Sequence, residues 1–457
     1  MVSRLARVGM NCARLNFSHG SLEDHLKSIK TVRRVSDDLG RFIAVMQDLP
    51  GPKIRVGQIP SGKMLLKRGQ IVSLIPDGEA LEKDAIPVHQ LNLAKYVPLG
   101  AMVFLADGTI RLEAIGKTSS QLKCRCLNSG TLLSGKGINV PKIQKSFHSF
   151  TDLDKQYLKF GLENRVDLVA ISFVRSAQDM ENVREFVNSN SSDPPWIISK
   201  IERREAVENA FTVIKASDAV MVARGDLGVE NPMEQVPVMQ KMIISECNRE
   251  AKPVITATQM LESMVGNPRP TRAETTDVAN AVFDGTDALM LSEETAVGSY
   301  PIECVKVLDR VARVAEKWIQ SESSTESNGG RRKDKGLSQA TSQLASQTGS
   351  KFIVCSTKNG TLAKQIARER PIAEIIAFTK SRTIANRLEI VRDLFPLVTA
   401  EETSPEASMK ALEASISKII LRNHIANSGD KIVFARNNVE YQNDDKKSEL
   451  LLSLEVQ

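Results

Sequence analysis

Seven short apolar runs recur along the chain, and each of them ends in polar or charged residues. Near-continuous apolar character over such short stretches is typical of strands buried on both faces of a parallel sheet. Segments of helical length, such as residues 175–190 and 272–285, lie between runs, and this alternation predicts a parallel α/β fold. The runs cover residues 12–18, 42–49, 166–174, 196–202, 219–228, 253–260 and 287–295.

The polar ends of these runs predict where the chemistry lies. In a (β/α)8 barrel the carboxyl ends of all strands face one mouth, so side chains far apart in the sequence meet there. A closed barrel has eight strands, whereas seven runs are visible and the chain starts in a helix-like stretch. We therefore expect a (β/α)8 TIM barrel without its first strand. The polar run ends are Asn16, Ser18, Asp48, Lys200, Glu202, Arg224, Asp226, Thr258 and Ser292.

Two interruptions divide the barrel pattern. Residues 50–165 are too many for one crossover helix, and their middle part reads as short β-stretches between Gly and Pro turns. Residues 320–336 are rich in Ser, Gly and charge, which is typical of a linker. We expect a catalytic barrel over 1–50 and 143–319, an all-β lid domain inserted over 51–142, the linker over 320–336, and a C-terminal α/β regulatory-type domain over 337–457.

Composition and charge exclude some classes of protein. The net charge of +6 (61 − 55) is mild for 457 residues, and 4% aromatics are few for a protein that stacks single-stranded bases, so no nucleic-acid partner is expected. The sequence contains no run of 18 apolar residues, so no transmembrane helix is predicted. The six cysteines are scattered, apart from Cys124 and Cys126, which a strand would point to one face. This usage indicates reduced thiols and a cytoplasmic location.

Two run ends combine a cation with carboxylates. Lys200 and Glu202 are two residues apart, so a strand points both the same way. Glu202 and Asp226 supply the oxygen ligands that Mg²⁺ prefers, and a neighbouring lysine suits a transferring phosphoryl group or an enolate. Taken alone, the pattern also fits a salt bridge at a strand end. Gly225 lets backbone amides at the start of a short helix approach a carboxylate or phosphate.

Other run ends supply cations, hydroxyls and neutral oxygens. Arg14, Asn16 and Ser18 share one face by period 2, and Arg14 can bind phosphate oxygens through its planar fork. His19 fits a base, a ligand or an ordinary helix N-terminal residue. Thr258 and Ser292 have no histidine nearby in the sequence, which favours a water or proton chain over a nucleophilic triad. Together the set indicates Mg²⁺-dependent phosphoryl or enolate chemistry.

Several motifs that span nearly the whole chain resemble those of the pyruvate kinase family. This family transfers the phosphoryl group of phosphoenolpyruvate to ADP, giving ATP and pyruvate in glycolysis, so the resemblance implies a cytoplasmic, Mg²⁺-dependent phosphotransferase, with Mn²⁺ as an alternative ion, and a homotetramer. The motifs are RLNFSHG (14–20), DLPGPKIR (48–55), SKIERREAVEN (199–209), VMVARGDLGVE (220–230), PVITATQMLESM (253–264) and RPTRAETTDVANAVFDGTDALMLSEETAVG (269–298).

The resemblance implies a role for each matching residue. Lys200 corresponds to the lysine that stabilises the transferring group and the enolate, and Arg14 to an arginine that contacts phosphate. Thr258 and Ser292 resemble the relay that protonates the enolate. The remaining implied roles are Mg²⁺ ligands at Glu202 and Asp226, the substrate carboxylate site at Gly225, Asp226 and Thr258, nucleotide contacts at Arg55, His19 and Lys136, and a K⁺ site at Asn16, Ser18, Asp48 and Leu49.

The chain departs from the family pattern in three places. K⁺-dependent members carry Glu where this chain has Lys53 and Thr where it has Leu49. An ammonium at Lys53 would replace the K⁺ charge, so we expect activity that does not require K⁺. The family's first strand is absent, which would leave unpaired strand edges beside the site. The tail lacks the Gly-rich loop of sugar-phosphate-regulated members, although STKNGT (356–361) offers a phosphate its backbone amides, so we expect weak or different regulation.

Two other functions remain open on the sequence. The missing strand is compatible with a catalytically impaired paralogue that acts as a binding or regulatory subunit. A barrel enzyme acting on enolates, such as a metal-dependent aldolase, is a further alternative, and the inserted β domain and the basic residues on the nucleotide side count against it. Turnover that depends on ADP would distinguish a pyruvate kinase from such an aldolase.

Overall fold

The central sheet of the computed structural model consists of seven parallel strands, one from each apolar run. The structure describes residues 1–78, 84–89, 91–106, 108–141, 149–323, 336–399, 409–439 and 448–456. The spatial order is β1-β2-β12-β13-β14-β15-β16, so the strands follow one another around the barrel. Their bounds are β1 (Cys12–Asn16), β2 (Ala44–Asp48), β12 (Leu168–Ile171), β13 (Trp196–Ile201), β14 (Ala219–Ala223), β15 (Val254–Ala257) and β16 (Ala288–Met290).

The two outermost strands of this sheet each have one neighbour. Among the described residues, β1 pairs with β2 and β16 pairs with β15, and no further strand joins their outer edges. The prediction of a curled parallel barrel sheet with seven visible strands is therefore confirmed.

Helices cover the outside of the sheet and begin where capping residues allow. Ser21, Thr151 and Thr271 cap three helices, and each is bonded reciprocally to an acidic residue three positions on. Gly40 ends the longest of these three helices with φ 59°, the left-handed conformation that favours glycine. The helices are α1 (Val2–Arg7), α2 (Leu22–Leu39), α3 (Asp152–Glu163), α4 (Ala177–Asn190), α5 (Arg204–Glu208), α6 (Ala210–Ala216), α7 (Arg224–Glu230), α8 (Val236–Arg249), α9 (Arg272–Asp284), α10 (Glu293–Ala296) and α11 (Pro301–Ser323), with short 3₁₀ turns η2 (Met233–Gln235) and η3 (Glu262–Val265).

An all-β domain is inserted after β2, as predicted. Its main sheet has the order β3-β11-β7-β8-β9-β5-β6, and a second sheet pairs β10 with β4. In β9 the side chains of Leu122, Cys124 and Cys126 point inward while the residues between them are exposed, which confirms that the two cysteines share a face. The bounds are β3 (Ile54–Arg55), β4 (Lys63–Leu66), β5 (Ile71–Pro76), β6 (Ala85–Val88), β7 (Met102–Leu105), β8 (Ile110–Lys117), β9 (Leu122–Cys126), β10 (Gly130–Leu133) and β11 (Gly137–Asn139), with the 3₁₀ turn η1 (Leu93–Lys95).

The C-terminal domain is a second α/β layer structure with the strand order β19-β18-β17-β20-β21. Its last strand, β21, runs antiparallel to β20, and neither β21 nor helix α15 was predicted from the sequence. Part of the predicted linker, residues 324–335, lies outside the described residues. The bounds are α12 (Leu337–Thr348), β17 (Phe352–Ser356), α13 (Thr361–Arg368), β18 (Glu374–Thr379), α14 (Arg382–Leu388), β19 (Leu394–Val398), α15 (Met409–Arg422), β20 (Lys431–Val439) and β21 (Ser448–Glu455).

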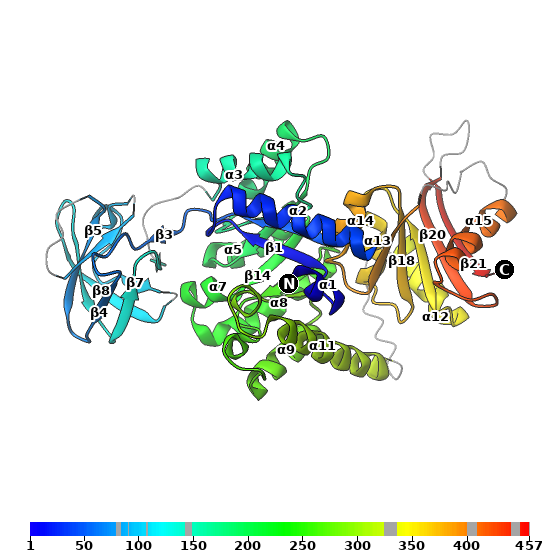
Figure 1. Ribbon diagram of the computed structural model, residues 1–457. Helices are drawn as coiled ribbons and strands as arrows, with labels where there is room; N and C mark the ends of the chain where they lie inside the picture. The colour runs from blue at the N-terminus through cyan, green and yellow to red at the C-terminus, as the bar shows by residue number, and fades with distance from the viewer. Residues whose placement is uncertain are drawn as a thin grey trace.

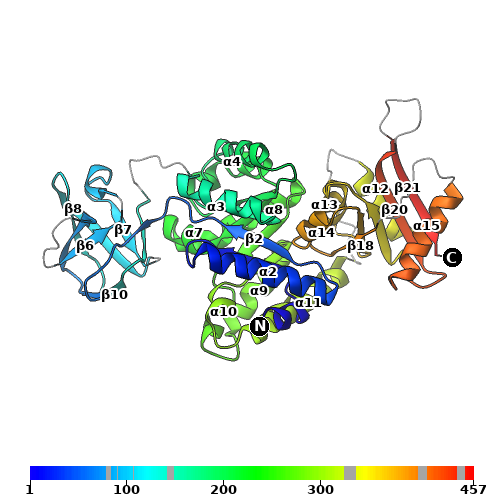
Figure 2. The same cartoon turned by 45° about the horizontal axis from the view of Figure 1, so that its top comes forward.

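The inserted domain and the C-terminal domain lie on opposite sides of the barrel (Figures 1 and 2). The inserted domain follows Asp48, at the carboxyl end of β2, so it lies on the side of the mouth. The C-terminal domain contacts residues that precede strands, because Asn386 Nδ2 donates to Asp167 Oδ1 at 3.1 Å and Arg392 N donates to Asp287 Oδ1 at 3.3 Å. We call this opposite face, where the strands begin, the base of the barrel.

No helix among the described residues combines the length and apolar character that crossing a membrane requires.

Candidate functional site

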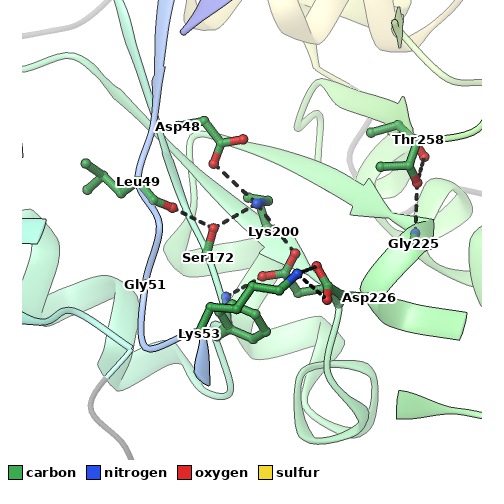
Figure 3. Close-up of polar contacts among 12 residues, drawn as sticks. Asp48, Leu49, Gly51, Lys53, Ser172, Lys200, Gly225, Asp226 and Thr258 are labelled. Atoms are coloured by element: carbon green, nitrogen blue, oxygen red, sulfur yellow. Dashed lines mark hydrogen bonds and ion pairs between the residues drawn. The ribbon is translucent and has the colours of Figure 1, made fainter. Parts of the chain in front are cut away.

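Lys200, on β13, lies at the centre of the polar cluster in the mouth. Its Nζ donates to Ser172 Oγ at 2.7 Å and to Asp48 Oδ1 at 3.2 Å, and lies 3.6 Å from Glu202 Oε2 (Figure 3). Burial alone would lower the pKa of Lys200, but Asp48 and Glu202 raise it above its ordinary value. The lysine is therefore held as an ammonium ion beside two carboxylates, as the period-2 spacing predicted for Glu202.

Asp48 ends β2 and is bound by two cations. Arg14 Nε, from β1, donates to Asp48 Oδ2 at 2.6 Å, and Lys200 takes the other oxygen. Burial alone would raise the pKa of Asp48, but Lys200 and Arg14 hold it below its ordinary value. The first two strands thus bring Arg14 into the same cluster as Lys200.

Glu202 is fully buried and one of its oxygens lacks a hydrogen bond. Oε1 accepts from the backbone N–H of Phe173 at 2.6 Å, whereas Oε2 has no hydrogen-bond donor among the described residues. Burial, only partly offset by Lys200, raises the pKa of Glu202 to about 7, and the Asp226 carboxylate adds to the increase. A buried carboxylate that the protein leaves half-satisfied, with a second carboxylate nearby, is what a cation site requires.

The two carboxylates fit a divalent metal that the substrate helps to bind. The described residues contain no group of three or more His, Cys, Asp or Glu side chains that would enclose an ion. Mg²⁺ needs no such group, because it is commonly held by one or two carboxylates together with water and substrate oxygens. Glu202, through its unbonded Oε2, and Asp226 are the residues that would hold it.

Asp226 lies in the first turn of α7, within the ARGDLG motif that was predicted to begin a short helix. Lys53 Nζ donates to Asp226 Oδ1 at 3.0 Å and to Oδ2 at 3.3 Å (Figure 3). Asn139 Nδ2, from β11 of the inserted domain, lies 3.4 Å from Asp226 Oδ1 and 3.5 Å from Glu230 Oε1. The carboxylate therefore receives donors from the connection to the inserted domain and from that domain itself.

The connection to the inserted domain passes close to the barrel at Gly51. This residue has φ 62°, a conformation that favours glycine, and a Cβ there would meet Phe173 and Ser172 atoms closely, at 3.1 Å. Gly51 N donates to Asp154 Oδ1 at 3.1 Å. The close approach holds Lys53 at the edge of the mouth.

Gly225 and Thr258 form the opposite edge of the mouth (Figure 3). Gly225 N donates to Thr258 Oγ1 at 2.8 Å, and Thr258 and Gln259 have positive φ values of 68° and 55°. Arg224 supports this turn because it donates to Thr258 O at 2.7 Å and pairs with Asp277 at 2.7 Å. Strained backbone held by such contacts is typical of functional sites.

Ser292 follows β16, the strand beside the one that Thr258 follows. Its backbone N donates to Glu294 Oε2 at 2.7 Å, and Leu261 N donates to Glu294 Oε1 at 3.1 Å. Glu294 thus ties the loop after β15 to the loop after β16. The two predicted relay hydroxyls lie on adjacent strand ends.

Two of the predicted nucleotide contacts, Arg55 and Lys136, lie near the third, His19. Burial lowers the pKa of His19, and the charges of Arg55, Arg14, Lys136 and Lys53 lower it further. Arg55 donates to Gly135 O at 3.1 Å, which fixes its position beside the loop that carries Lys136. The structure therefore gathers one imidazole and four cations at the side of the mouth that faces the inserted domain.

The predicted K⁺ ligands are already in contact with donors. Asn16 Oδ1 accepts from Ser18 N at 3.1 Å, and Leu49 O accepts from Ser172 Oγ at 2.6 Å. Ser18 does not continue the strand face of Arg14 and Asn16, because β1 ends at Asn16 and Ser18 lies in the following turn. That part of the period-2 prediction was wrong.

Two residues with clear roles in the geometry were not singled out from the sequence. Ser172 joins Lys200 to Leu49, and Asn139 reaches Asp226 from the inserted domain. Ser172 carried a signal, since it is the polar residue directly after the apolar stretch 168–171. Asn139 carried none, because its position depends on how the inserted domain packs on the barrel.

Comparison with known proteins places these residues in a family. Residues 1–305 match the family model "Pyruvate kinase, barrel domain" and residues 335–443 match "Pyruvate kinase, alpha/beta domain". The pyruvate kinase of Sporosarcina psychrophila is 38% identical over 439 residues, which are 95% of this chain and 74% of that protein. The pyruvate kinases of Thermococcus litoralis (39%, covering 88% of this chain and 86% of the relative) and Clostridium acetobutylicum (37%, covering 95% and 92%) are similarly related.

Proposed function

The chain belongs to the pyruvate kinase family and is a phosphotransferase, and we propose that it works with Mg²⁺ at Glu202 and Asp226 and without K⁺. Its substrates are phosphoenolpyruvate and ADP. The observation that carries the metal proposal is the buried Glu202 Oε2, which has no hydrogen-bond donor among the described residues. Bound Mg²⁺ would neutralise substrate oxygens and align them with the two carboxylates.

The reaction needs positive charge where the phosphoryl group leaves the enol oxygen. The P–O bond to that oxygen breaks and a new P–O bond forms to a β-phosphate oxygen of ADP, which leaves an enolate. Lys200, whose pKa is raised by Asp48 and Glu202 against the effect of burial, keeps its ammonium in the mouth to stabilise both the phosphoryl oxygens and the enolate. Arg14, held by Asp48 at 2.6 Å, adds a second cation for the phosphoryl group.

The other edge of the mouth suits the substrate carboxylate and the final proton. The backbone amides of Gly225 and Asp226 lie in the first turn of α7, where N–H groups favour an anion. Thr258 Oγ1 accepts from Gly225 N at 2.8 Å and donates to Ala257 O at 2.6 Å, so its hydroxyl must turn from that carbonyl to give a proton to the enolate carbon. We propose Thr258 and Ser292 as the relay that converts the enolate to pyruvate. On the opposite side, Arg55, His19 and Lys136 bind the phosphates of ADP.

Independence from K⁺ is supported by the donors around the predicted K⁺ ligands. Both Asp48 oxygens receive cations from the chain, and the Leu49 carbonyl receives the Ser172 hydroxyl. Lys53 supplies a further fixed charge beside Asp226. These groups already provide the positive charge that a bound monovalent cation would add.

The test is pyruvate formation from phosphoenolpyruvate and ADP with Mg²⁺, with and without K⁺ at constant ionic strength. We expect turnover in both conditions, with rates that differ by less than about twofold, and none after chelation of the divalent ion. The Lys53→Glu variant, assayed in parallel, should gain a K⁺ requirement. A large rate increase on adding K⁺ to the unmodified chain would contradict the K⁺ proposal without affecting the Mg²⁺ proposal.

We further propose a cytoplasmic homotetramer. The cytoplasmic location is supported by the glycolytic role of the family and by six cysteines that are all free thiols in the structure. The tetramer rests on the family alone, and sedimentation equilibrium of the purified chain tests it.

A further inference from the structure

A cleft lies at the base of the barrel. The end of α8 and the loop from α8 to β15 line its barrel side, and α13 lines its C-terminal-domain side. The cleft is at the opposite end of the strands from Lys200 and Glu202, so it is separate from the site described above. Its empty volume of about 210 Å³ includes open solvent, so it is an open cleft and not an enclosed cavity. The lining residues are Asn248, Ala251, Lys252, Pro253 and Asp287 of the barrel and Lys364, Arg368 and Val391 of the C-terminal domain.

Lys364 brings an uncompensated charge into this cleft. Its Nζ lies 4.3 Å from the ring centroid of Trp196, and among the described residues it makes no hydrogen bond or ion pair. Burial lowers the pKa of Lys364 to about 8, and the charges of Lys252 and Arg184 add to the decrease against the single opposing carboxylate, Asp218. The ammonium is thus partly desolvated and faces an excess of positive charge.

Neither Lys252 nor Arg368 neutralises the positive charge around Lys364. Lys252 Nζ donates to two neutral acceptors, Ser217 O at 2.5 Å and Lys215 O at 3.2 Å. Its pKa is also lowered, chiefly by burial. Arg368 pairs with Glu369 at 2.9 Å and contributes little net charge.

Asp287 also lines the cleft, and its carboxylate is engaged elsewhere. It accepts from the backbone N–H groups of Val254 at 2.9 Å and Arg392 at 3.3 Å. Burial raises the pKa of Asp287 to about 6, and the guanidinium groups of Arg370 and Arg392 oppose that increase. Its charge is therefore stabilised by groups other than the two lysines.

We propose that this cleft binds a small oxyanion, a phosphate or a carboxylate, between Lys252 of the barrel and Lys364 of the C-terminal domain. An anion there would neutralise two ammonium groups that repel each other, and a charge-assisted hydrogen bond to each would follow. Because the two lysines belong to different domains, the bound anion would tie the C-terminal domain to the base of the barrel. The two ammonium groups are charged donors, which suits a single phosphate or carboxylate group between them.

The chain provides a local reporter for this site. Of its two tryptophans, Trp196 is buried against Lys364, and Trp318 lies half exposed on α11. A Trp318→Phe background leaves Trp196 as the one source of tryptophan fluorescence. Inorganic phosphate and malonate, each titrated at constant ionic strength, then probe the cleft in the full chain.

We expect a saturable change in Trp196 fluorescence with phosphate, with malonate or with both. Saturation by phosphate alone assigns the site to phosphorylated ligands, and saturation by malonate alone assigns it to carboxylates. In Lys364→Met the apparent affinity should fall about tenfold or more, as expected for loss of a charged hydrogen bond, while Lys364→Arg retains binding. Lys30→Met, which removes an exposed charge on α2, is the matched control and should bind like the parent.

Two outcomes would overturn the proposal. One is the absence of any saturable change with either anion in the Trp318→Phe parent. The other is a change of equal affinity in Lys364→Met, since the anion would then bind somewhere else, such as the mouth or the loop before α13. Far-ultraviolet circular dichroism establishes that the Lys364 variants are folded before either outcome is interpreted.

Discussion

The mouth and the base of the barrel both contain buried or partly buried carboxylates at strand ends, and the two sets are bonded differently. At the base, Asp167, Asp218 and Asp287 directly precede alternate strands β12, β14 and β16. Each accepts a backbone N–H from a neighbouring strand end, at 2.7 Å from Val45, 2.9 Å from Ile197 and 2.9 Å from Val254. Each of these carboxylates therefore has a backbone donor, and two of them also pair with a cation, Asp167 with Arg33 at 2.8 Å and Asp218 with Arg184 at 3.1 Å.

At the mouth, Asp48 and Asp226 have side-chain donors but no backbone donor among the described residues, and Glu202 has one backbone donor and one unbonded oxygen. Asp48 is held by Arg14 and Lys200, Asp226 by Lys53, and Glu202 Oε2 has no hydrogen-bond donor among the described residues. A carboxylate that accepts a backbone N–H is fixed by the fold, whereas one held only by side-chain cations can respond to a substrate or a metal. The comparison supports a stabilising role for the carboxylates at the base and the proposed catalytic role for those at the mouth.

The strongest test of the comparison is Lys200→Met. Loss of the ammonium removes the charge that we propose stabilises the enolate, so we expect kcat to fall about 10³-fold, in the range seen when one such donor is removed. Steady-state kinetics measures the effect, and circular dichroism establishes that the variant is folded. Lys30→Met serves as a control for charge alone. A variant within about tenfold of the parent would show that Lys200 is not central to the chemistry.

The Asp167→Ala variant tests whether a carboxylate at the base contributes to stability and not to catalysis. Asp167 is 1% exposed and pairs with Arg33 at 2.8 Å, besides its bonds to Val45 N and Asn386. Breaking such a buried pair should lower the free energy of unfolding by about 3 kcal/mol. Urea denaturation measures this loss, and the kcat of the folded enzyme should not change.

Asp152→Ala, which alters an exposed carboxylate on α3, is the matched control and should leave the urea midpoint almost unchanged. If Asp167→Ala lowered kcat more than stability, the assignment of the base to stability would be wrong.

Apolar patterning was enough to predict the architecture but not the bonding within it. All seven barrel strands lie within predicted runs because a strand buried on both faces needs apolar residues throughout. Helix α15 was missed although Leu412, Ile416, Ile419 and Ile420 follow a helical period and are buried, and strand β21 was missed as well. Lys200 and Glu202 were predicted to meet because they share a strand, whereas the Lys53–Asp226 pair joins residues 173 positions apart. Such a pair depends on domain packing, which no local pattern records.

Glu389, at the base, is a carboxylate whose negative charge is expected to lower the free energy of unfolding. This residue, directly after α14, accepts from Asn11 Nδ2 at 2.6 Å, and burial raises its pKa to about 7. Because this value lies above the ordinary 4.5, the folded chain binds the proton more tightly than the unfolded chain does. The stability from the protonated form is complete at low pH and is lost as pH rises through about 7.

The Glu389→Gln variant keeps the acceptor for Asn11 and removes the charge. At pH 8 it should be more stable than the parent by up to about 3 kcal/mol, and the difference should shrink as pH falls and vanish below the ordinary pKa of 4.5. Thermal unfolding at a series of pH values measures this difference. A gain that is the same at pH 5 and pH 8 would mean that the charge of Glu389 is not the cause.

The smallest expected effect concerns Ser172, a mouth residue that acts on Lys200 by positioning it. Its hydroxyl accepts from Lys200 Nζ at 2.7 Å and donates to Leu49 O at 2.6 Å. Ser172→Ala should lower kcat about five- to tenfold, with little change in KM, because one hydrogen bond that orients the ammonium is lost. Ser199→Ala is the matched control, since Ser199 is equally buried on β13 and bonds to Ser217 at 2.9 Å, away from the mouth. It should lose stability by about 1 kcal/mol and keep its kcat. Equal kcat values for the two variants would mean that Lys200 is oriented by Asp48 and Glu202 alone, which would narrow the catalytic part of the mouth to its charges.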